Sequence, residues 1–204
     1  MRKVIALLFA LCAVALPASL PVSDFNQPPD MTDDLAASLY LTVEAWKVPV
    51  GAANRFAAEA KATPEEFQVA AFLANQSGLP LAEIWDSRLK SRSWARVAEL
   101  AGVTMDQLMF TPAKDYGAPY SKAYSFWRNH PRGWSDRSFS VDDVEFIRLV
   151  EVQTLMRASG KNADEIVASL SAGDTFTRLA ASIYRQRHAP SQAPKASKPK
   201  KQAH

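Results

Sequence analysis

Residues 73–101 read LANQSGLPLAEIWDSRLKSRSWARVAELA, and residues 155–183 read LMRASGKNADEIVASLSAGDTFTRLAASI. Aligned without a gap at an offset of 82, the two stretches are identical at eight of 29 positions. The pairs that match or nearly match include Ser77 and Ser159, Gly78 and Gly160, Glu83 and Glu165, Trp94 and Phe176, and Arg96 and Arg178. Because these residue types pack, cap and end helices, the pattern predicts a duplicated helical unit.

Helix start and stop signals surround both stretches. A capping threonine, a first-turn proline and a later glutamate stand at 63–66, and Gly78 can end the helix that they open. Residues 140–143 form an acidic version of the same start, with its helix running to about Ala158. Gly160 and Asn162 then end one helix and open the next, and residues 32–34 cap a helix through about Trp46. No period-two strand or hairpin turn is evident, so the prediction is all-α.

We therefore predict two related three-helix units joined by an aromatic-rich connecting helix. The predicted segments are a secretory signal peptide at 1–18, a proline-rich lead-in at 19–31, an N-terminal helical unit at 32–112, an aromatic and arginine-rich connector at 113–139, a C-terminal helical unit at 140–188, and a disordered Lys/Pro/Ala tail at 189–204. Trp94 and Phe176 are expected to fill the centres of their units, where burial of such a ring stabilises by roughly 2–3 kcal/mol. Glu83–Arg96 and Glu165–Arg178 contacts are expected within the units.

The first residues resemble an export signal. Arg2 and Lys3 precede an apolar run at 4–15, and cleavage is expected after Ala15 or Ala18. The run is too short for a spanning helix of about 20 residues, and no second long apolar run follows it. We expect a periplasmic or extracellular protein without a transmembrane span. A lipid anchor on Cys12 is the less favoured alternative, because Leu11 is larger than the residue that usually precedes a lipidated cysteine.

Charge and cysteine content narrow the function classes. Cys12 is the only cysteine, so the mature chain has no disulfide, thiolate metal site or cysteine nucleophile. The chain carries a net charge of +3, with two cations in residues 1–18 and four in residues 189–204, so residues 19–188 carry about −3. The tail is able to touch anionic polymers or lipid headgroups, or simply keeps the chain soluble. An acidic body argues against a nucleic-acid partner.

Residues 93–109 resemble the helix-turn-helix segment of DNA-binding regulators. Ala98, Gly102, Val103 and Leu108 occupy the positions where that motif places a small residue, a turn glycine and two core residues. The second helix of the segment carries Asp106 and no lysine or arginine, whereas DNA binding requires a basic, phosphate-facing surface. We interpret the segment as a helical corner.

The connector between the repeats has the most unusual composition. Its candidate binding residues are Tyr120, Tyr124, Trp127, Arg128, His130, Arg132 and Trp134. Tyr120, Tyr124 and Trp127 recur at helical spacing and are expected on one face. Rigid aromatic residues and arginines dominate recognition surfaces, so this segment is the candidate site for an envelope protein or polymer. The alternative is an internal seam that seals the two units together.

Signals for catalysis are weak. No histidine pair has metal-ligand spacing, no phosphate-cradling loop is present, and no cofactor is predicted. Adjacent carboxylates at 33–34, 65–66 and 142–143 sit at predicted helix starts, where the helix dipole favours them. The sequence thus favours an exported, non-enzymatic interaction or scaffold protein. Two alternatives stay open, a small cell-wall or peptide hydrolase that uses Glu83 or Glu165 as its acid, and a small-ligand-binding protein.

Overall fold

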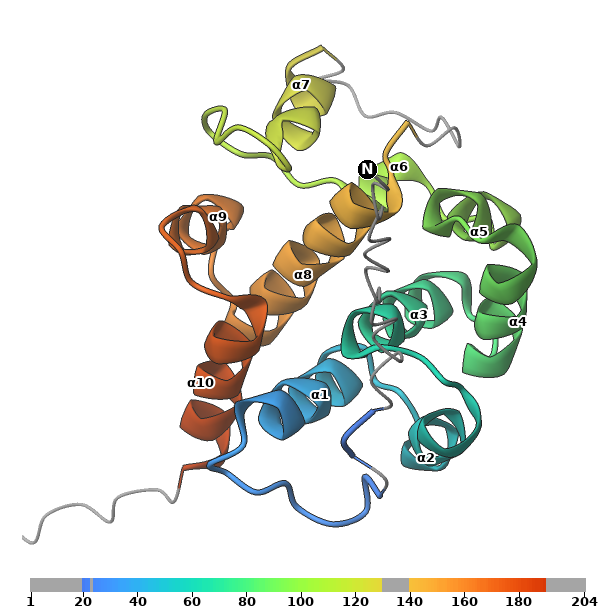
Figure 1. The fold of residues 1–204 in the computed structure, drawn as a ribbon. Helices are drawn as coiled ribbons and strands as arrows, with labels where there is room; N and C mark the ends of the chain where they lie inside the picture. The colour runs from blue at the N-terminus through green and yellow to red at the C-terminus, as the bar shows by residue number, and fades with distance from the viewer. Residues whose placement is uncertain (1–19, 23, 130–139, 190–204) are drawn as a thin grey trace, which may run out of the picture.

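The computed structural model describes residues 20–22, 24–129 and 140–189. Within these ranges the chain forms ten α-helices and no strand, which confirms the all-α prediction (Figure 1). The helices are α1 (Asp34–Ala45), α2 (Val50–Glu59), α3 (Pro64–Ser77), α4 (Leu81–Ser91), α5 (Trp94–Leu100), α6 (Met105–Leu108), α7 (Ser121–Asn129), α8 (Asp143–Ser159), α9 (Ala163–Ser171) and α10 (Phe176–His188). None of the helices in the described ranges is long and apolar enough to cross a membrane.

The caps explain where these helices begin. The Asp33 side chain accepts hydrogen bonds from two backbone N–H groups of α1, and Thr63 forms a reciprocal capping box with Glu66 at the start of α3. α8 begins after Ser140, the first residue of its predicted start at 140–143. Asp142, rather than Ser140, is the cap, because only Asp142 has a glutamate three residues on, Glu145, to complete the box.

The helices of the two matched stretches begin and end with equivalent capping residues. Gly78 after α3 and Gly160 after α8 both adopt the left-handed conformation, with φ of 74° and 72°. Ser93 and Thr175 cap α5 and α10, each accepting a hydrogen bond from a backbone N–H three residues on. The order α3–α4–α5 is therefore repeated locally as α8–α9–α10. That the two stretches arose by duplication stays a prediction.

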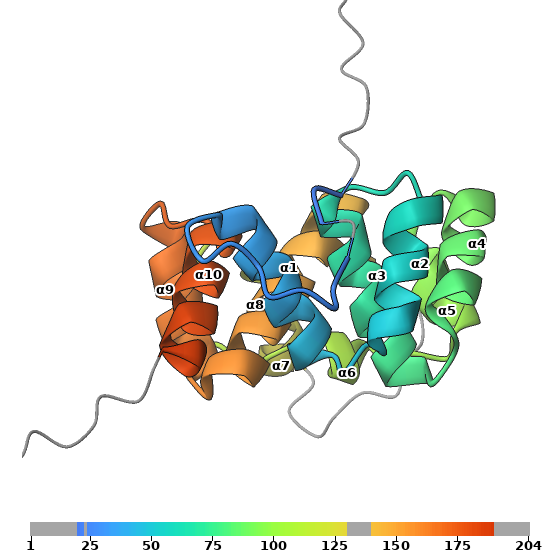
Figure 2. The same ribbon diagram turned by 90° about the horizontal axis from the view of Figure 1, so that it is seen from below.

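The longest helix, α8, lies at the centre of the molecule. It packs against α1, α3, α5, α6, α9 and α10. Seen from below, α9 and α10 lie on one side of α1 and α8, and α2, α4 and α5 lie on the other (Figure 2). Because α8 has neighbours on several sides, the residues at 149–152 along its middle are all buried.

The most extensive helix contact joins the two ends of the described chain. α1 and α10 pack along each other, and charged pairs reinforce the contact. Arg185 Nη2 lies 2.5 Å from Asp34 Oδ1, and Glu44 accepts from Arg187 and His188 at 3.2 and 2.7 Å. The last helix of the C-terminal unit is thus held by the first helix of the N-terminal unit, and the two predicted units share one core.

Trp94 and Phe176 differ in burial, although they occupy matched positions. Trp94 is fully buried as predicted, with the Arg88 guanidinium 4.7 Å from its ring centroid. Phe176 is only partly buried, because α10 turns away to pack on α1. The expected Glu–Arg contacts are absent from the described residues. Arg96 pairs with Glu99 at 2.8 Å, and Arg178 pairs with Asp174, one helix turn away, because these partners are nearer in sequence.

Two features of the core were not predicted. The lead-in is part of the fold, since Leu20, Val22 and Phe25 are buried and the Phe25 ring lies 5.8 Å from that of Phe67. α2 is the second, and its Phe56 ring also lies against Phe67, at 5.4 Å. The predicted helical corner at 93–109 is present as α5, a left-handed Gly102 and the four-residue α6.

Candidate functional site

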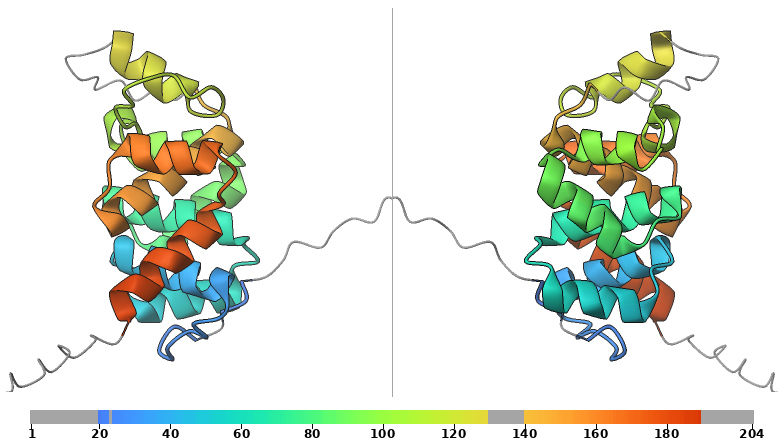
Figure 3. Two further views of the ribbon diagram at one scale, coloured as in Figure 1. Left: turned by 90° about the vertical axis from the view of Figure 1, so that its left-hand side faces the viewer. Right: turned by 90° about the vertical axis from the view of Figure 1, so that its right-hand side faces the viewer.

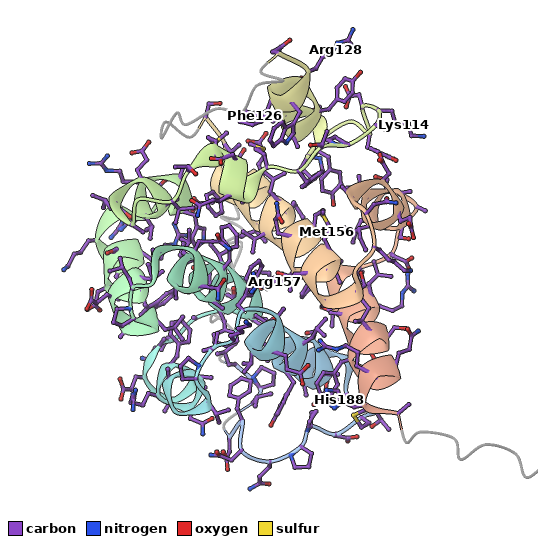
Figure 4. The ribbon with its side chains drawn as sticks, turned by 180° about the vertical axis from the view of Figure 1, so that it is seen from behind. Lys114, Phe126, Arg128, Met156, Arg157 and His188 are labelled. Carbon is purple, nitrogen blue, oxygen red and sulfur yellow. The ribbon has the colours of Figure 1, made fainter. Side chains whose placement is uncertain are left out.

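Part of the predicted binding segment lies on the surface. Tyr124 and Arg128 stand one turn apart on α7, where Arg128 Nη1 donates to the Tyr124 hydroxyl at 2.8 Å. The side views in Figure 3 place α7 at one end of the molecule. Figure 4 shows Arg128 on the outer part of this helix. His130, Arg132 and Trp134 lie outside the described residues.

The remaining predicted aromatics turn inward. Tyr120 lies just before α7 and is buried, and Trp127 is half-buried. The buried positions of α7 itself are Ala123 and Phe126, so the inward face follows 120–123–126, and Tyr124 and Trp127 lie beside it. The connector therefore both packs against the body and presents a surface.

Tyr120 lines a hollow in the body, which we call the polar hollow. Its volume is about 620 Å³, within the range of small-molecule sites. α1, α3, α8, the loop between α9 and α10, and the connector segment 116–120 surround it. The side chains that give the hollow its chemical character are Gln68, Tyr116, Tyr120, Arg148, Glu151 and Phe176.

An ion pair on α8 forms the charged wall of the polar hollow. Arg148 Nη1 donates to both oxygens of Glu151, at 2.6 and 2.8 Å. The Glu151 side chain is 2% exposed, whereas that of Arg148 is 46% exposed. Burial raises the pKa of Glu151 above its usual range, although Arg148 opposes the shift. Burial, together with the charge of Glu151, also raises the pKa of Tyr120 to about 12, which keeps its phenol protonated.

A buried hydrogen-bond network behind the hollow fixes the orientation of Gln68. The Thr154 hydroxyl donates to Val150 O at 2.8 Å and accepts from Trp46 Nε1 at 3.0 Å. It also bonds Gln68 at 3.1 Å. Because the single hydroxyl proton is already donated, Gln68 must present its amide NH₂ to Thr154. The amide carbonyl of Gln68 is thereby directed away from the network.

A second, more apolar hollow lies between α2, the end of α3, and α4. It measures about 720 Å³, and its lining includes Phe56, Leu81 and Trp85. Leu79 and Leu89 at its edges are exposed at 38% and 59%. We call this feature the apolar groove, although Lys47, Arg55, Glu59 and Asp86 also line it.

The proposed acids of the hydrolase alternative lie apart from both hollows. Glu83 and Glu165 are exposed in the first turns of α4 and α9, and neither lines the polar hollow or the apolar groove. Within the described residues no group of three His, Cys, Asp or Glu side chains has a metal-binding arrangement.

Comparison with known proteins gives no functional assignment. No protein-family model, curated protein or solved structure matches the chain. The function must therefore be inferred from the geometry of the molecule.

Sequence reasoning found Tyr120 but not its neighbours in the hollow. Gln68 and Glu151 stand among apolar residues in their helices, between Phe67 and Val69 and between Val150 and Val152. A lone polar residue within an apolar run is the sequence signal that could have indicated these two residues, because a buried polar group needs a partner or a function. The groups that contact such a residue depend on how α3, α8 and the connector pack together.

Proposed function

We propose that this chain is an exported, non-enzymatic binding protein whose ligand site is the polar hollow. The observation that carries the proposal is the position of Tyr120, which brings the predicted binding segment against the Arg148–Glu151 pair, whose glutamate is buried. Convergent polar groups with perturbed pKa values in a concave site favour a functional role. Export rests on the predicted signal at 1–18.

A ligand screen tests the proposal. The purified protein is heated with a set of small cations, anions and neutral compounds, and bound compounds are identified by a raised unfolding temperature. Ser171 is exposed at the edge of the hollow, so Ser171→Trp places a ring over the opening without altering the core. We expect the stabilisation by bound compounds to be lost in this variant.

Ser125→Trp is the matched control, because Ser125 is exposed on α7 and does not line the hollow. It should retain every stabilisation. Compounds that stabilise both variants equally, or an absence of any stabilising compound, would contradict the proposal.

A second candidate function is binding of an envelope protein or polymer through α7. The pair of half-buried Tyr124 and exposed Arg128 favours it, since an arginine on an aromatic ring is a common element of recognition surfaces. Sedimentation with peptidoglycan tests this candidate. The protein should pellet without releasing soluble fragments, and Arg128→Ala should stay in solution. Fragments that disappear in Glu83→Gln or Glu165→Gln would instead support the hydrolase.

A further inference from the structure

Two side chains in the walls of the polar hollow, Gln68 and Tyr120, have hydrogen-bonding groups that no described residue pairs with. Gln68 is 2% exposed, and its hydrogen bond to Thr154 uses one amide N–H, so the carbonyl oxygen and the second N–H remain available to the hollow. None of the described residues hydrogen-bonds that oxygen or the hydroxyl of Tyr120, which is 5% exposed. Both oxygens are open to the hollow, and a bound ligand with N–H groups can donate to the carbonyl oxygen of Gln68.

The same walls carry more negative than positive charge. Glu65, Glu151 and Asp174 line the hollow with Arg148 as the one cationic side chain in its lining, and Asp174 is paired with Arg178 beside it. Glu151 receives two hydrogen bonds from one guanidinium nitrogen, whereas a carboxylate has about four acceptor positions. An additional cation is therefore accommodated better than an additional anion.

Aromatic rings complete the lining. Tyr116, Tyr120 and Phe176 all border the hollow, and the faces of such rings attract cations. Tyr116 already has a cation on its ring, since Lys114 Nζ lies 5.0 Å from the ring centroid. Lys114 comes from the loop before α7 and is labelled in Figure 4. The site thus combines acceptors, carboxylates and rings, the groups that recognise an ammonium ion.

We infer that the polar hollow binds a small organic ammonium ion, an inference that rests on the proposed function. Its N–H groups donate to the Gln68 carbonyl and the Glu151 carboxylate, and its carbon skeleton lies against Tyr120 and Phe176. Arg148 stays paired with Glu151 and neutralises part of the negative charge of the lining, so a ligand with a single positive charge is sufficient.

Three matched probes test the charge of the ligand: 2-phenylethylammonium, 2-phenylethanol and 3-phenylpropionate. They share a benzene ring and differ in their cationic, neutral or anionic group. Titration followed by protein NMR should give an affinity for the ammonium at least about tenfold higher than for the alcohol, with the carboxylate weakest; tenfold is about 1.4 kcal/mol. If the carboxylate binds as tightly as the ammonium, the inference is wrong, while loss of that binding in Ser171→Trp would leave the proposed function intact.

Glu151→Gln tests the contact without changing side-chain size. We expect the affinity for 2-phenylethylammonium to fall to that for 2-phenylethanol. Glu83→Gln is the matched control, since Glu83 is an exposed helix carboxylate that does not line the hollow, and its affinity should be unchanged. Equal losses in both variants, or no loss in Glu151→Gln, would overturn the inference.

The pH dependence of the unaltered protein gives a test that needs no variant. The charged or titratable groups facing Glu151 are Arg148 on α8, Glu65 on α3 and Tyr120 in the connector. An ammonium ligand favours ionised Glu151, so its affinity should be full above the raised pKa of that group and should fall about tenfold per pH unit below it. An affinity that is constant between about pH 8 and about pH 4 would refute the inference.

Discussion

The Thr154→Val substitution removes one hydroxyl from the centre of the protein and keeps the side-chain shape. Thr154 is fully buried, and its oxygen serves both Trp46, which is 3% exposed, and Gln68, which is 2% exposed. Both side chains are almost fully buried, although Gln68 borders the polar hollow. Leaving a buried donor unsatisfied costs about 1–3 kcal/mol, so the free energy of unfolding should fall by roughly 2–6 kcal/mol.

Thr42→Val is the matched control for this change. Thr42 is 1% exposed, and its hydroxyl donates only to Ser38 O, so no buried side chain depends on it as an acceptor. The control should lose about 1 kcal/mol or less. Thr154→Ser, which keeps the hydroxyl and loses a methyl group, should lie between the two.

Urea denaturation monitored by circular dichroism measures all three variants. The slopes of the transitions should be similar, so that the midpoints report stability directly. If Thr154→Val unfolds within about 1 kcal/mol of Thr42→Val, the network does not hold the Gln68 amide in place. Thr154→Val should also weaken ligand binding in the polar hollow, because it releases the amide that directs the Gln68 carbonyl.

Two further predictions concern the matched stretches. Trp94→Ala should lower the free energy of unfolding by about 3–5 kcal/mol, whereas Phe176→Ala should cost clearly less because its ring is only partly buried; equal losses in urea denaturation would contradict the different packing of the two copies. Gly78→Ala and Gly160→Ala should each cost about 1–2 kcal/mol, since both glycines have positive φ and open space around the position of a Cβ; a clear difference between them would show that the two helix ends are not equivalent.

The connector shows what could and could not be predicted from the sequence. Its composition marked it as a candidate site, and Tyr120 does line the polar hollow. The buried side chains of α7 are Ala123 and Phe126, which lie beside the expected 120–124–127 face rather than on it. Aromatic residues on several sides of a short helix leave the buried side undetermined until the neighbouring helices are in place.

Helix order and helix ends are the properties that the sequence by itself determined. Thr63, Gly78, Asn162 and Gly160 act through hydrogen bonds and φ angles within a few residues, so their effect can be deduced locally. Matched ends also made the repeated helix order visible before the fold was known.

The polar hollow was decided only by tertiary structure. Gln68, Tyr120 and Glu151 come from α3, the connector and α8, and none of them has a sequence neighbour that reveals the others. Their proximity depends on how α3 and the connector pack against α8. The packing of α10 on α1 adds Phe176 to the lining of the hollow, while its counterpart Trp94 is buried in the core. The burial that raises the pKa of Glu151 likewise depends on side chains brought together from distant segments, and no local pattern encodes it.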